Sequence, residues 1–467
     1  MLDYKKLGLI AGLEVHQQLD TNKLFCRCPS YLRKDEPHFS LKRKLHAVLG
    51  ETGEVDVAAQ FESSLNKEFT YEGYDSTCLV ELDESPPLEI NQEALDIALQ
   101  ISLLLNCEIV PINQIMRKTV IDGSNTSGFQ RTVQIAKNGW LETSSGVINI
   151  WYVYLEEDAA RPVSKEKESR TFRLDRLGIP LVEIVTAPDI KTPEQAREIA
   201  LKIGEILRAC KVKRGIGTIR QDINISIKKS NRVEIKGFQE PRIMIKTVET
   251  EVKRQLSILE RKEKNPSEVR QTLPDGRTEF LRPLPGKARM YPETDLPLLK
   301  ISRDKINKIK KHLPKLKADI KSELEKQGLS AELINLITSS EKNLEEFNAL
   351  IKTYDKDANL VAKMVTLWRN EKVTEEHLKE ILHLLKEKKI EKEDVKDVIK
   401  KISKGEELKQ AFKEEKASHH ELEEEIAKVI KKKPGLRPNA YMGLIMAQFK
   451  GLVSPQKAME IINKLLK

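Results

Sequence analysis

The chain has 467 residues, more than one hydrophobic core normally organises, so two to four domains are expected. Lysine and arginine number 81 against 72 aspartate and glutamate, and this net charge of +9 makes an extended polyanion a sensible partner to test. No apolar run approaches the ~20 residues that cross a bilayer, and the N-terminus lacks a signal peptide's long apolar region. We therefore expect a cytoplasmic protein without a membrane-spanning segment.

The five cysteines, an odd number in a long chain, indicate free thiols rather than a disulfide framework. Cys26 and Cys28 form a C-x-C pair, and no second close pair in the sequence completes a tetrahedral zinc site. Cys78 or His46 could fold beside this pair. A structural zinc ion and plain thiols therefore both stay open.

Residues 1 to about 300 mix short alternating strands with two helices and irregular loops, without regular βαβ repeats. This pattern favours a largely antiparallel α+β domain. One helix is predicted to begin after Thr192, because Pro193 suits the first helical position and Gln195 completes a capping box. The other covers about 91–105 and is apolar on nearly every side, so we expect it to be buried.

Near residue 300 the sequence changes to segments rich in Lys, Glu, Leu and Ile at helical spacing, such as "TEEHLKEILHLLKEKK" and "SPQKAMEIINKLLK". These segments predict helix bundles, with Thr374 and Ser454 as N-caps. A second boundary near Gly405 separates about sixty C-terminal residues. We predict an N-terminal α+β domain over 1–300, an all-α helical domain over 301–404 and a small helical tail domain over 405–467.

Acidic, basic and imidazole side chains recur on single faces of the predicted strands. In "GLEVHQQL", alternation puts Glu14 and His16 on one face and Leu13 and Val15 on the other. The same alternation occurs in "WYVYLEED", "IRQDINISI" and "VEIKGF", and "PLVEIVT" places one glutamate among aliphatic residues. A solvated antiparallel sheet also has a polar face. These faces nevertheless combine Glu, Asp, His, Asn and Arg rather than the Lys and Thr of a solvated surface.

This composition indicates a site for ATP and Mg²⁺, with a solvated sheet as the alternative. Carboxylates with one imidazole suit a hard cation such as Mg²⁺, which keeps waters and accepts phosphate oxygens. Neighbouring Arg and Lys would neutralise a transferring phosphate, which favours this site over a hydrolytic zinc site. The chain has no G-x-x-x-x-G-K-[ST] loop, and "RGIGTIR" follows a helix and enters a strand, the reverse of the dinucleotide-binding order.

Several motifs together resemble one known family. "GLEVHQQLDTNKLFC", "YLEEDAAR", "RLDRLGIPLVEIVTAPD", "IRQDINISI" and "VEIKGFQE" occur in the order found in the B and E subunits of tRNA-dependent amidotransferases, the GatB/GatE family. "YDSTCLVELDESPP", "DGSNTSGFQRT" and "LRPLPGKARMYPETDLP" resemble the archaeal E branch more than the bacterial B branch. "LRPNAYMGLIMAQFKG" resembles the family's tail domain, so the similarity covers nearly the full length.

The resemblance implies a catalytic "cradle" domain that works as a ligase forming a C–N bond, with glutamine as amido donor. ATP phosphorylates the γ-carboxylate of glutamate esterified to tRNA(Gln), and ammonia then displaces phosphate to give Gln-tRNA(Gln). The cofactors implied are ATP and Mg²⁺. The partners implied are an asparaginase-like glutaminase of the GatD type, in a heterotetramer, and tRNA(Gln) charged with Glu; no membrane is involved.

The resemblance also assigns roles to residues that match the family's motifs. The candidates for the catalytic and metal site are Glu14, His16, Glu156 and Glu183. The candidates for phosphate or nucleotide contact are Arg220, Asn224, Lys236 and Gln130. Asp158 and Asp222 are expected to orient those side chains.

Two alternatives for the function stay open. The chain could be a B-type subunit that acts on Glu-tRNA(Gln) and Asp-tRNA(Asn) with an amidase partner, or a tRNA-binding module without chemistry. E-branch members carry a large inserted domain after the helix containing "VETEVKRQL", whereas here only "SILERKEKNPSEVRQT" joins the flanking segments. Candidates for tRNA contact are the basic segments 310–321 and 428–438 and the tail domain.

Overall fold

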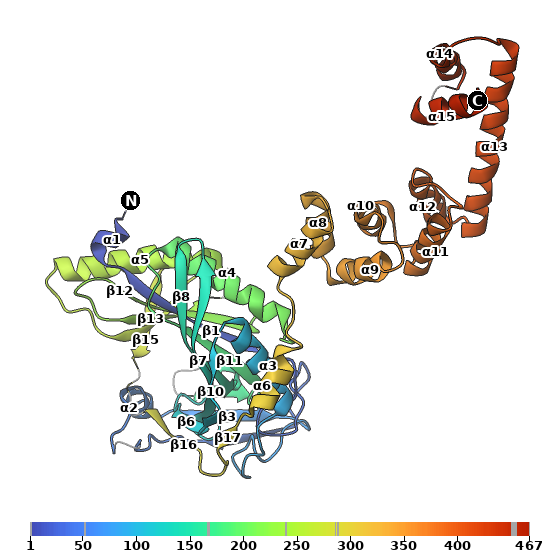
Figure 1. Ribbon diagram of the computed structural model, residues 1–467. Helices are drawn as coiled ribbons and strands as arrows, with labels where there is room; N and C mark the ends of the chain where they lie inside the picture. The colour runs from blue at the N-terminus through green and yellow to red at the C-terminus, as the bar shows by residue number, and fades with distance from the viewer. Residues whose placement is uncertain are drawn as a thin grey trace. The chain divides into compact units, whose positions relative to one another are not determined.

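The computed structural model, shown in Figure 1, describes residues 2–50, 53–165, 169–238, 241–284, 286, 289–449 and 455–466. The chain forms two compact units, Met1–Leu316 and Lys317–Lys467, and each is described by itself. No helix among the described residues is long and apolar enough to cross a membrane.

The first unit mixes strands and helices. Its strands are β1 (Ile10–Gln18), β2 (Phe39–Arg43), β3 (Glu68–Gly73), β4 (Glu108–Ile109), β5 (Ile112–Asn113), β6 (Met116–Thr119), β7 (Phe129–Thr143), β8 (Gly146–Glu157), β9 (Arg161–Lys165), β10 (Ser169–Arg173), β11 (Pro180–Thr186), β12 (Ile219–Ser226), β13 (Val233–Phe238), β14 (Glu268–Thr272), β15 (Thr278–Pro283), β16 (Met290–Pro292) and β17 (Leu299–Lys300). Its helices are α1 (Tyr4–Leu7), α2 (Val57–Ser64), α3 (Gln92–Leu104), α4 (Pro193–Ala209), α5 (Pro241–Glu260) and α6 (Arg303–Lys310).

An 11-stranded sheet forms the centre of this unit, in the order β15-β14-β13-β12-β1-β11-β8-β7-β6-β16, with β4 paired to β7. Neighbouring strands are antiparallel except β13 and β14, which are parallel. A smaller sheet, β2-β3-β10-β9, and a β17-β5 pair complete the unit. The predicted α+β fold with a largely antiparallel N-terminal part is confirmed.

One face of the large sheet is apolar and covered by helices. Leu13 and Val15 on β1 and Ile223 on β12 are fully buried, as the alternation in the sequence predicts. They join one core with the buried sides of α3, α4 and α5, and Figure 1 shows α4 and α5 lying across this part of the sheet. The opposite face is therefore left to carry the polar side chains.

The predicted helix signals explain where α3 and α4 begin. Thr192 Oγ1 accepts a hydrogen bond from the Gln195 N–H at 3.1 Å, and Pro193 is the first helical residue. The Gln195 side chain accepts from the Lys191 N–H at 2.8 Å, so it closes the cap one residue before the N-cap. Asn91 caps α3 in the same way, and much of α3 is buried, as predicted.

The two ends of the large sheet are joined by a short segment, residues 284–289, which connects β15 to β16. Arg282 on β15 and Met290 on β16 line the same cavity although these strands stand at opposite ends of the strand order. The sheet must therefore curve around that cavity.

The second unit is helical. Its helices are α7 (Lys317–Lys326), α8 (Ala331–Thr338), α9 (Glu341–Ile351), α10 (Ala358–Lys363), a π-helical turn (Met364–Trp368), α11 (Glu375–Lys386), α12 (Val395–Lys404), α13 (Leu408–Lys432), α14 (Pro438–Gln448) and α15 (Pro455–Leu465). One hydrophobic cluster runs from Leu324 to Ala411 and another from Ile426 to Ile462. Thr374 caps α11 through a capping box with His377, whereas Ser454 lies outside the described residues. The boundaries predicted at 300 and 404 stay predictions.

Candidate functional site

A cavity of about 810 Å³ lies on the polar face of the large sheet, within the first unit. Strands β1, β6, β7, β8, β11, β12, β13 and β15 all contribute side chains to its wall. The sequence-predicted residues that line it are Glu14, His16, Gln130, Glu156, Asp158, Glu183, Arg220, Asp222 and Lys236. The structure thus brings together motifs separated by more than two hundred residues.

Strand register explains why these side chains meet. Strand β1 lies between β11 and β12, so His16 is opposite Glu183 on one side and opposite Arg220 on the other. Glu14 is opposite Asp222 in the same way. Directly opposed residues in antiparallel strands project from the same face. A shift of β1 by one residue in register would turn Glu14 and His16 toward the apolar core.

Two groups of donor atoms in the cavity could hold a cation. The ligand atoms of Glu14, His16 and Glu183 lie within 4.8 Å of one another, and so do those of Glu14, Asp222 and Glu234. His16 Nε2 is 3.5 Å from Glu183 Oε1. Because Glu14 belongs to both groups, it joins two adjacent positions for a hard cation.

Glu156 is held differently from these donors. It pairs with Lys118, accepts a hydrogen bond from Thr132 Oγ1 at 2.8 Å, and accepts another from Gln130 Nε2 at 3.1 Å. Lys118 Nζ also lies 3.3 Å from Glu183 Oε2. Lys118 therefore links Glu156 to the cation-binding group, and the role of Glu156 as a direct metal ligand stays a prediction.

The carboxylates strongly influence one another's protonation. Burial, together with the charges of Glu234 and Glu183, raises the pKa of Glu14 to about 7. Burial and the nearby charge of Glu183 also raise the pKa of Glu156. For Glu183 itself, burial is outweighed by the charge of Lys118 and the hydrogen bond from His16, so its pKa is well below the usual value.

The nearby carboxylates also change the pKa of His16. Burial alone would lower the pKa of His16, but the hydrogen bond and charge of Glu183 outweigh burial and raise it. The cavity therefore concentrates negative charge around Glu14 and His16. A divalent cation would relieve that repulsion, so the donor set fits Mg²⁺ in both charge and chemistry.

The predicted phosphate-contact residues lie in or beside the cavity, but most are paired with protein groups. Lys236 Nζ lies 2.7 Å from Asp222 Oδ2 and 2.5 Å from Glu234 Oε1. Arg220 donates to Asp158 Oδ1 at 2.8 Å.

The two amides among these candidates hold carboxylates. Gln130 donates to Glu156, and Asn224 Nδ2 donates to Glu14 Oε1 at 2.8 Å without lining the cavity itself. Both amides fix the direction of an acidic side chain. Their predicted contact with phosphate or nucleotide stays a prediction.

Sequence reasoning did not select several residues of the cavity wall. Glu234 shares a strand face with Lys236, so the alternation in "VEIKGF" contained its signal. Lys118 stands on β6, which has four residues, too few to show a periodicity. The remaining cationic residues in this group are Arg232, Arg282 and Arg289.

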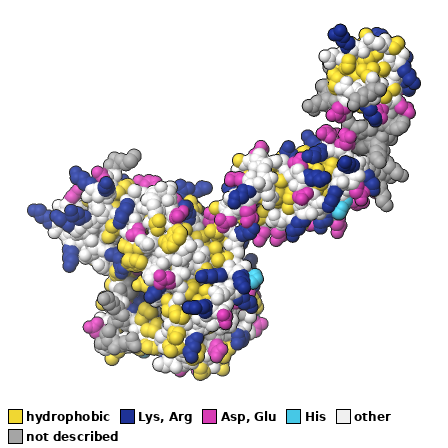
Figure 2. Space-filling view, viewed as in Figure 1, with side chains coloured by type: hydrophobic (Ala, Val, Ile, Leu, Met, Phe, Trp, Pro, Cys, Tyr) yellow, Lys and Arg dark blue, Asp and Glu magenta, His cyan; other side chains and the backbone are white. Residues whose placement is uncertain are grey.

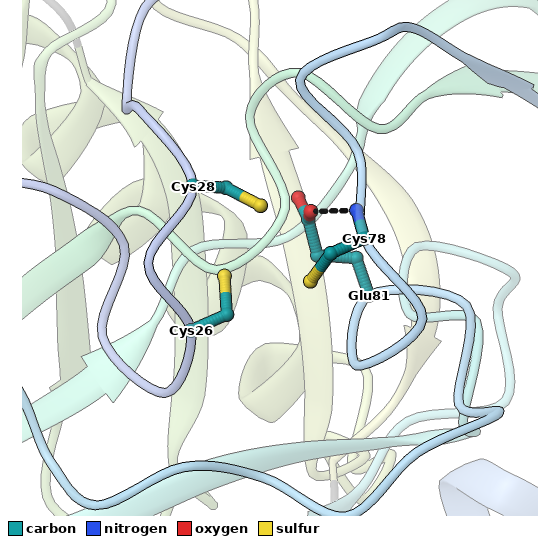
Figure 3. A group of neighbouring side chains, drawn as sticks. All are labelled: Cys26, Cys28, Cys78 and Glu81. Carbon is teal, nitrogen blue, oxygen red and sulfur yellow. Dashed lines mark hydrogen bonds between the residues drawn. The ribbon is translucent and has the colours of Figure 1, made fainter.

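A second group of side chains that could hold a metal ion lies in loops. The ligand atoms of Cys26, Cys28, Cys78 and Glu81 lie within 4.8 Å of one another, and Figure 3 shows the three thiols and the carboxylate turned toward a common point. Glu81 also accepts from the Cys78 N–H at 2.8 Å and pairs with the buried Lys23. We call these four residues the thiol cluster.

The thiol cluster resolves one question that the sequence left open. Cys78, rather than His46, is the residue that joins the C-x-C pair. The hydrogen bonds shared by the three thiols lower the pKa of Cys78 and raise the pKa of Cys26, so the cluster favours a single thiolate at Cys78. Three thiols and a carboxylate suit a tetrahedral zinc ion. A zinc ion and plain thiols both stay open here.

Known proteins match this chain over both the sheet and the helices. The GatB/GatE catalytic domain matches residues 9–307. The E subunit of glutamyl-tRNA(Gln) amidotransferase from Methanocaldococcus jannaschii is 35% identical over 626 aligned residues, covering 100% of this chain and 99% of the relative. The protein of the same name from Methanosarcina barkeri is 34% identical over 623 residues, covering 99% and 98%.

The lengths of these alignments are informative. Each exceeds the 467 residues of this chain, so the relatives contain segments for which this chain has no counterpart. That agrees with the short connection between α5 and β14. The match to the catalytic domain nevertheless includes every strand that contributes to the cavity, and the chain belongs to the GatB/GatE family.

Proposed function

We propose that this chain is the component of a tRNA-dependent amidotransferase that uses ATP to phosphorylate the γ-carboxylate of Glu-tRNA(Gln) and then amidates it to Gln-tRNA(Gln). The observation that carries the proposal is the cavity, where Glu14, His16 and Glu183 could hold a cation beside Lys118 and Glu156. The names of the archaeal relatives, which match along the full chain, support the choice of substrate.

The chemistry requires such a site because both reactants are anions. A γ-carboxylate oxygen must form a bond to the γ-phosphorus of ATP while the bond from that phosphorus to the bridging oxygen breaks and ADP leaves. Mg²⁺ bound by Glu14, His16 and Glu183 would supply the positive charge that lets the two anions approach. Lys118 adds a fixed cation next to these donors.

The second step exchanges phosphate for nitrogen. Ammonia attacks the carbonyl carbon of the acyl phosphate, the carbon–oxygen bond to phosphate breaks, and the departing phosphate can take the proton that nitrogen loses. Glu156, Asp158 and Glu183 are all buried in the wall, so the protein replaces water with fixed polar groups around the reacting atoms. Exclusion of water protects the acyl phosphate from hydrolysis.

The source of ammonia lies outside this chain in our proposal. Free ammonia is scarce at neutral pH, so we propose a glutaminase partner of the asparaginase-like D type, in a cytoplasmic heterotetramer, that delivers ammonia directly. The archaeal relatives are each named as one subunit of an amidotransferase, which supports an enzyme built from more than one kind of chain.

Contact with tRNA is proposed through the basic segments 310–321 and 428–438 and the tail domain. On the face shown in Figure 2, cationic and anionic side chains are interspersed over the second unit. On that face, recognition would therefore depend on local phosphate contacts.

Reconstitution tests the function directly. The full chain is combined with a D-type partner or an amidase-type partner, and each mixture receives ATP, glutamine and either Glu-tRNA(Gln) or Asp-tRNA(Asn). We expect Gln-tRNA(Gln) only with the D-type partner, and ATP hydrolysis stimulated by Glu-tRNA(Gln). Product with the amidase-type partner would instead identify a B-type subunit. Salt-dependent tRNA binding without ATP turnover would identify a binding module.

A further inference from the structure

Three arginines at the cavity differ from the other cations there. Lys118, Lys236 and Arg220 are each paired with a carboxylate. Arg232, Arg282 and Arg289 also line the cavity, and across the described part of the chain no ion pair joins them to an acid. We call these three residues the arginine wall.

Two of the three arginines of the arginine wall lie at the ends of the sheet. Arg282 lies on β15 and Arg289 directly precedes β16, whereas Arg232 directly precedes β13, which is inside the strand order. Within the described residues Arg289 makes one side-chain hydrogen bond, from its Nε to the carbonyl oxygen of Thr119 at 3.2 Å. In that part of the chain its other guanidinium donors are left for a ligand.

One residue between Arg282 and Arg289 is anchored. The Gly286 N–H donates to Asp56 Oδ1 at 2.7 Å. The other oxygen of Asp56 accepts from the Ala58 and Ala59 N–H groups at the start of α2, so this buried aspartate ties Gly286 to a helix. Gly286 itself lines the cavity, between the two arginines in the chain.

The position of Arg289 relates the arginine wall to the carboxylates. Its neighbour Met290 is paired with Lys118 across β16 and β6. Lys118 in turn reaches both Glu156 and Glu183. Arg289 consequently borders the end of the cavity where the cation-binding group lies.

The positive charge of Arg289 is not fully compensated by the protein. Burial and the nearby charge of Arg282 lower its pKa, and the opposing charges of Glu156, Glu234 and Asp56 offset this only in part. Arginine does not give up its proton in proteins, so the repulsion is relieved by binding an anion rather than by deprotonation. Two guanidinium groups present the paired donors that match phosphate oxygens.

Resting on the proposed function, we propose that Arg282 and Arg289, with Arg232 at the rim, bind the phosphate chain of the nucleotide and retain the phosphoryl group through both steps. While the γ-phosphorus moves from the bridging oxygen of ATP to the γ-carboxylate, its outer oxygens stay on the arginines. When ammonia breaks the carbon–oxygen bond, the same arginines hold the departing inorganic phosphate.

Nucleotide binding by the full chain tests this assignment. Calorimetry with Mg²⁺ compares ATP, ADP, AMP and inorganic phosphate on the unaltered chain and on Arg289→Gln, Arg289→Lys and Arg282→Gln. We expect each Gln variant to bind ATP about 10- to 100-fold more weakly, because charge-assisted hydrogen bonds are lost. AMP binding should change less than about twofold. Arg289→Lys should recover part of the loss, since it keeps the charge but not the paired donors.

The matched control is Arg277→Gln, an exposed arginine that pairs with Asp275 in the turn before β15. It should bind ATP as the unaltered chain does. Circular dichroism separates misfolding from a lost contact, and Arg289→Lys keeps the test decisive if a Gln variant misfolds.

The outcomes separate the two proposals. An unaltered chain that neither binds nor hydrolyses ATP in the reconstituted enzyme would overturn the proposed function. Turnover by that enzyme, with unchanged ATP affinity in folded arginine variants, would overturn the arginine wall alone. A rise in KM for Glu-tRNA(Gln) with unchanged ATP affinity would also overturn it, because the arginines would then contact RNA.

Discussion

The molecule contains two groups of side chains that could hold a metal ion, and the groups differ in how they are built. Glu14, His16 and Glu183 come from adjacent strands and open into a cavity of about 810 Å³. The thiol cluster comes from loops, and its four ligand atoms lie within 4.8 Å of one another. The first can admit a nucleotide, whereas the second can hold at most an ion. We therefore expect the strand group to govern chemistry and the thiol cluster to govern stability.

Glu156→Gln should have the largest effect. The amide keeps the shape of the side chain but removes the charge paired with Lys118, which still has Glu183 at 3.3 Å. We expect the formation of Gln-tRNA(Gln) in the reconstituted enzyme to fall about 10²- to 10³-fold, because electrostatic groups at the reacting atoms contribute on this scale. Single-turnover kinetics measures this loss.

The control for that variant is Glu260→Gln, at the exposed end of α5. It should be fully active, and both variants should show unchanged circular dichroism. Activity of Glu156→Gln within tenfold of the unaltered enzyme would remove Glu156 from the site.

Cys78→Ser tests whether the thiol cluster binds a metal ion that stabilises the fold. We expect the purified chain to hold one zinc ion, and the variant to lose it and melt about 5 °C lower, because a bound structural metal contributes directly to folding. ATP turnover per folded molecule should stay within a few-fold. Elemental analysis and thermal melting are the measurements.

A buried cysteine outside the thiol cluster provides the matched control. Cys210 is buried at the end of α4. Cys210→Ser should keep the metal even if it melts earlier. Equal metal content in both variants and the unaltered chain would show that the thiol cluster binds none.

The contrast between residues on strands and residues in loops also explains which parts of the site the sequence could predict. Alternation in β1, β8, β11 and β12 placed Glu14, His16 and Glu183 on one face, because a strand turns every second side chain to the same side. Hydrophobic burial then fixed the register that brings them together. The starts of α3 and α4 were predictable for a similar local reason. The side chains of Asn91 and Thr192 accept hydrogen bonds from backbone N–H groups two or three residues later.

Local alternation and helix caps could not predict residues whose positions depend on long connections or on the closure of the sheet. Cys78 reaches Cys26 and Cys28 through a connection of some fifty residues with no repeating pattern. Arg282 and Arg289 face the cavity because the curved sheet brings its two ends together, and no local sequence signal encodes that closure. The register of long-range pairs and the path of connections therefore limited the prediction of the site.

Asn224→Ala should have a smaller effect within the strand group. Asn224 is outside the cavity wall but donates to Glu14 Oε1 at 2.8 Å, so it orients a cation-binding oxygen. Loss of such an orienting partner weakens metal binding about 10- to 100-fold. Titration with Mn²⁺ as a spectroscopic substitute for Mg²⁺ measures the change.

Asn149→Ala is the matched control, because Asn149 lies on the same sheet but donates to the half-buried Asp189, which does not line the cavity. It should leave Mn²⁺ affinity unchanged. If Asn224→Ala also binds Mn²⁺ normally, Glu14 is held by other contacts or is not a ligand.

The smallest expected effect is a dependence on pH. Burial and the charges of Glu234 and Glu183 raise the pKa of Glu14 from 4.5 to about 7 in the cation-free protein. The folded chain therefore holds a proton that the unfolded chain releases between these values, so its stability falls as the pH rises from about 4.5 to 7.

Cation binding should show the opposite trend, because the cation and the proton compete for the same carboxylate. We expect Mn²⁺ affinity to rise with pH through about 7, because Glu14 and His16, whose pKa values are both raised, each give up a proton when the cation binds. Measurements at pH 6, 7 and 8 test this slope. In Glu14→Gln the affinity should be weak, and the slope should fall by about one proton per ion. An unaltered chain whose Mn²⁺ affinity is the same at pH 6 and pH 8 would mean that the cation binds without Glu14, and the strand group would then need a different centre.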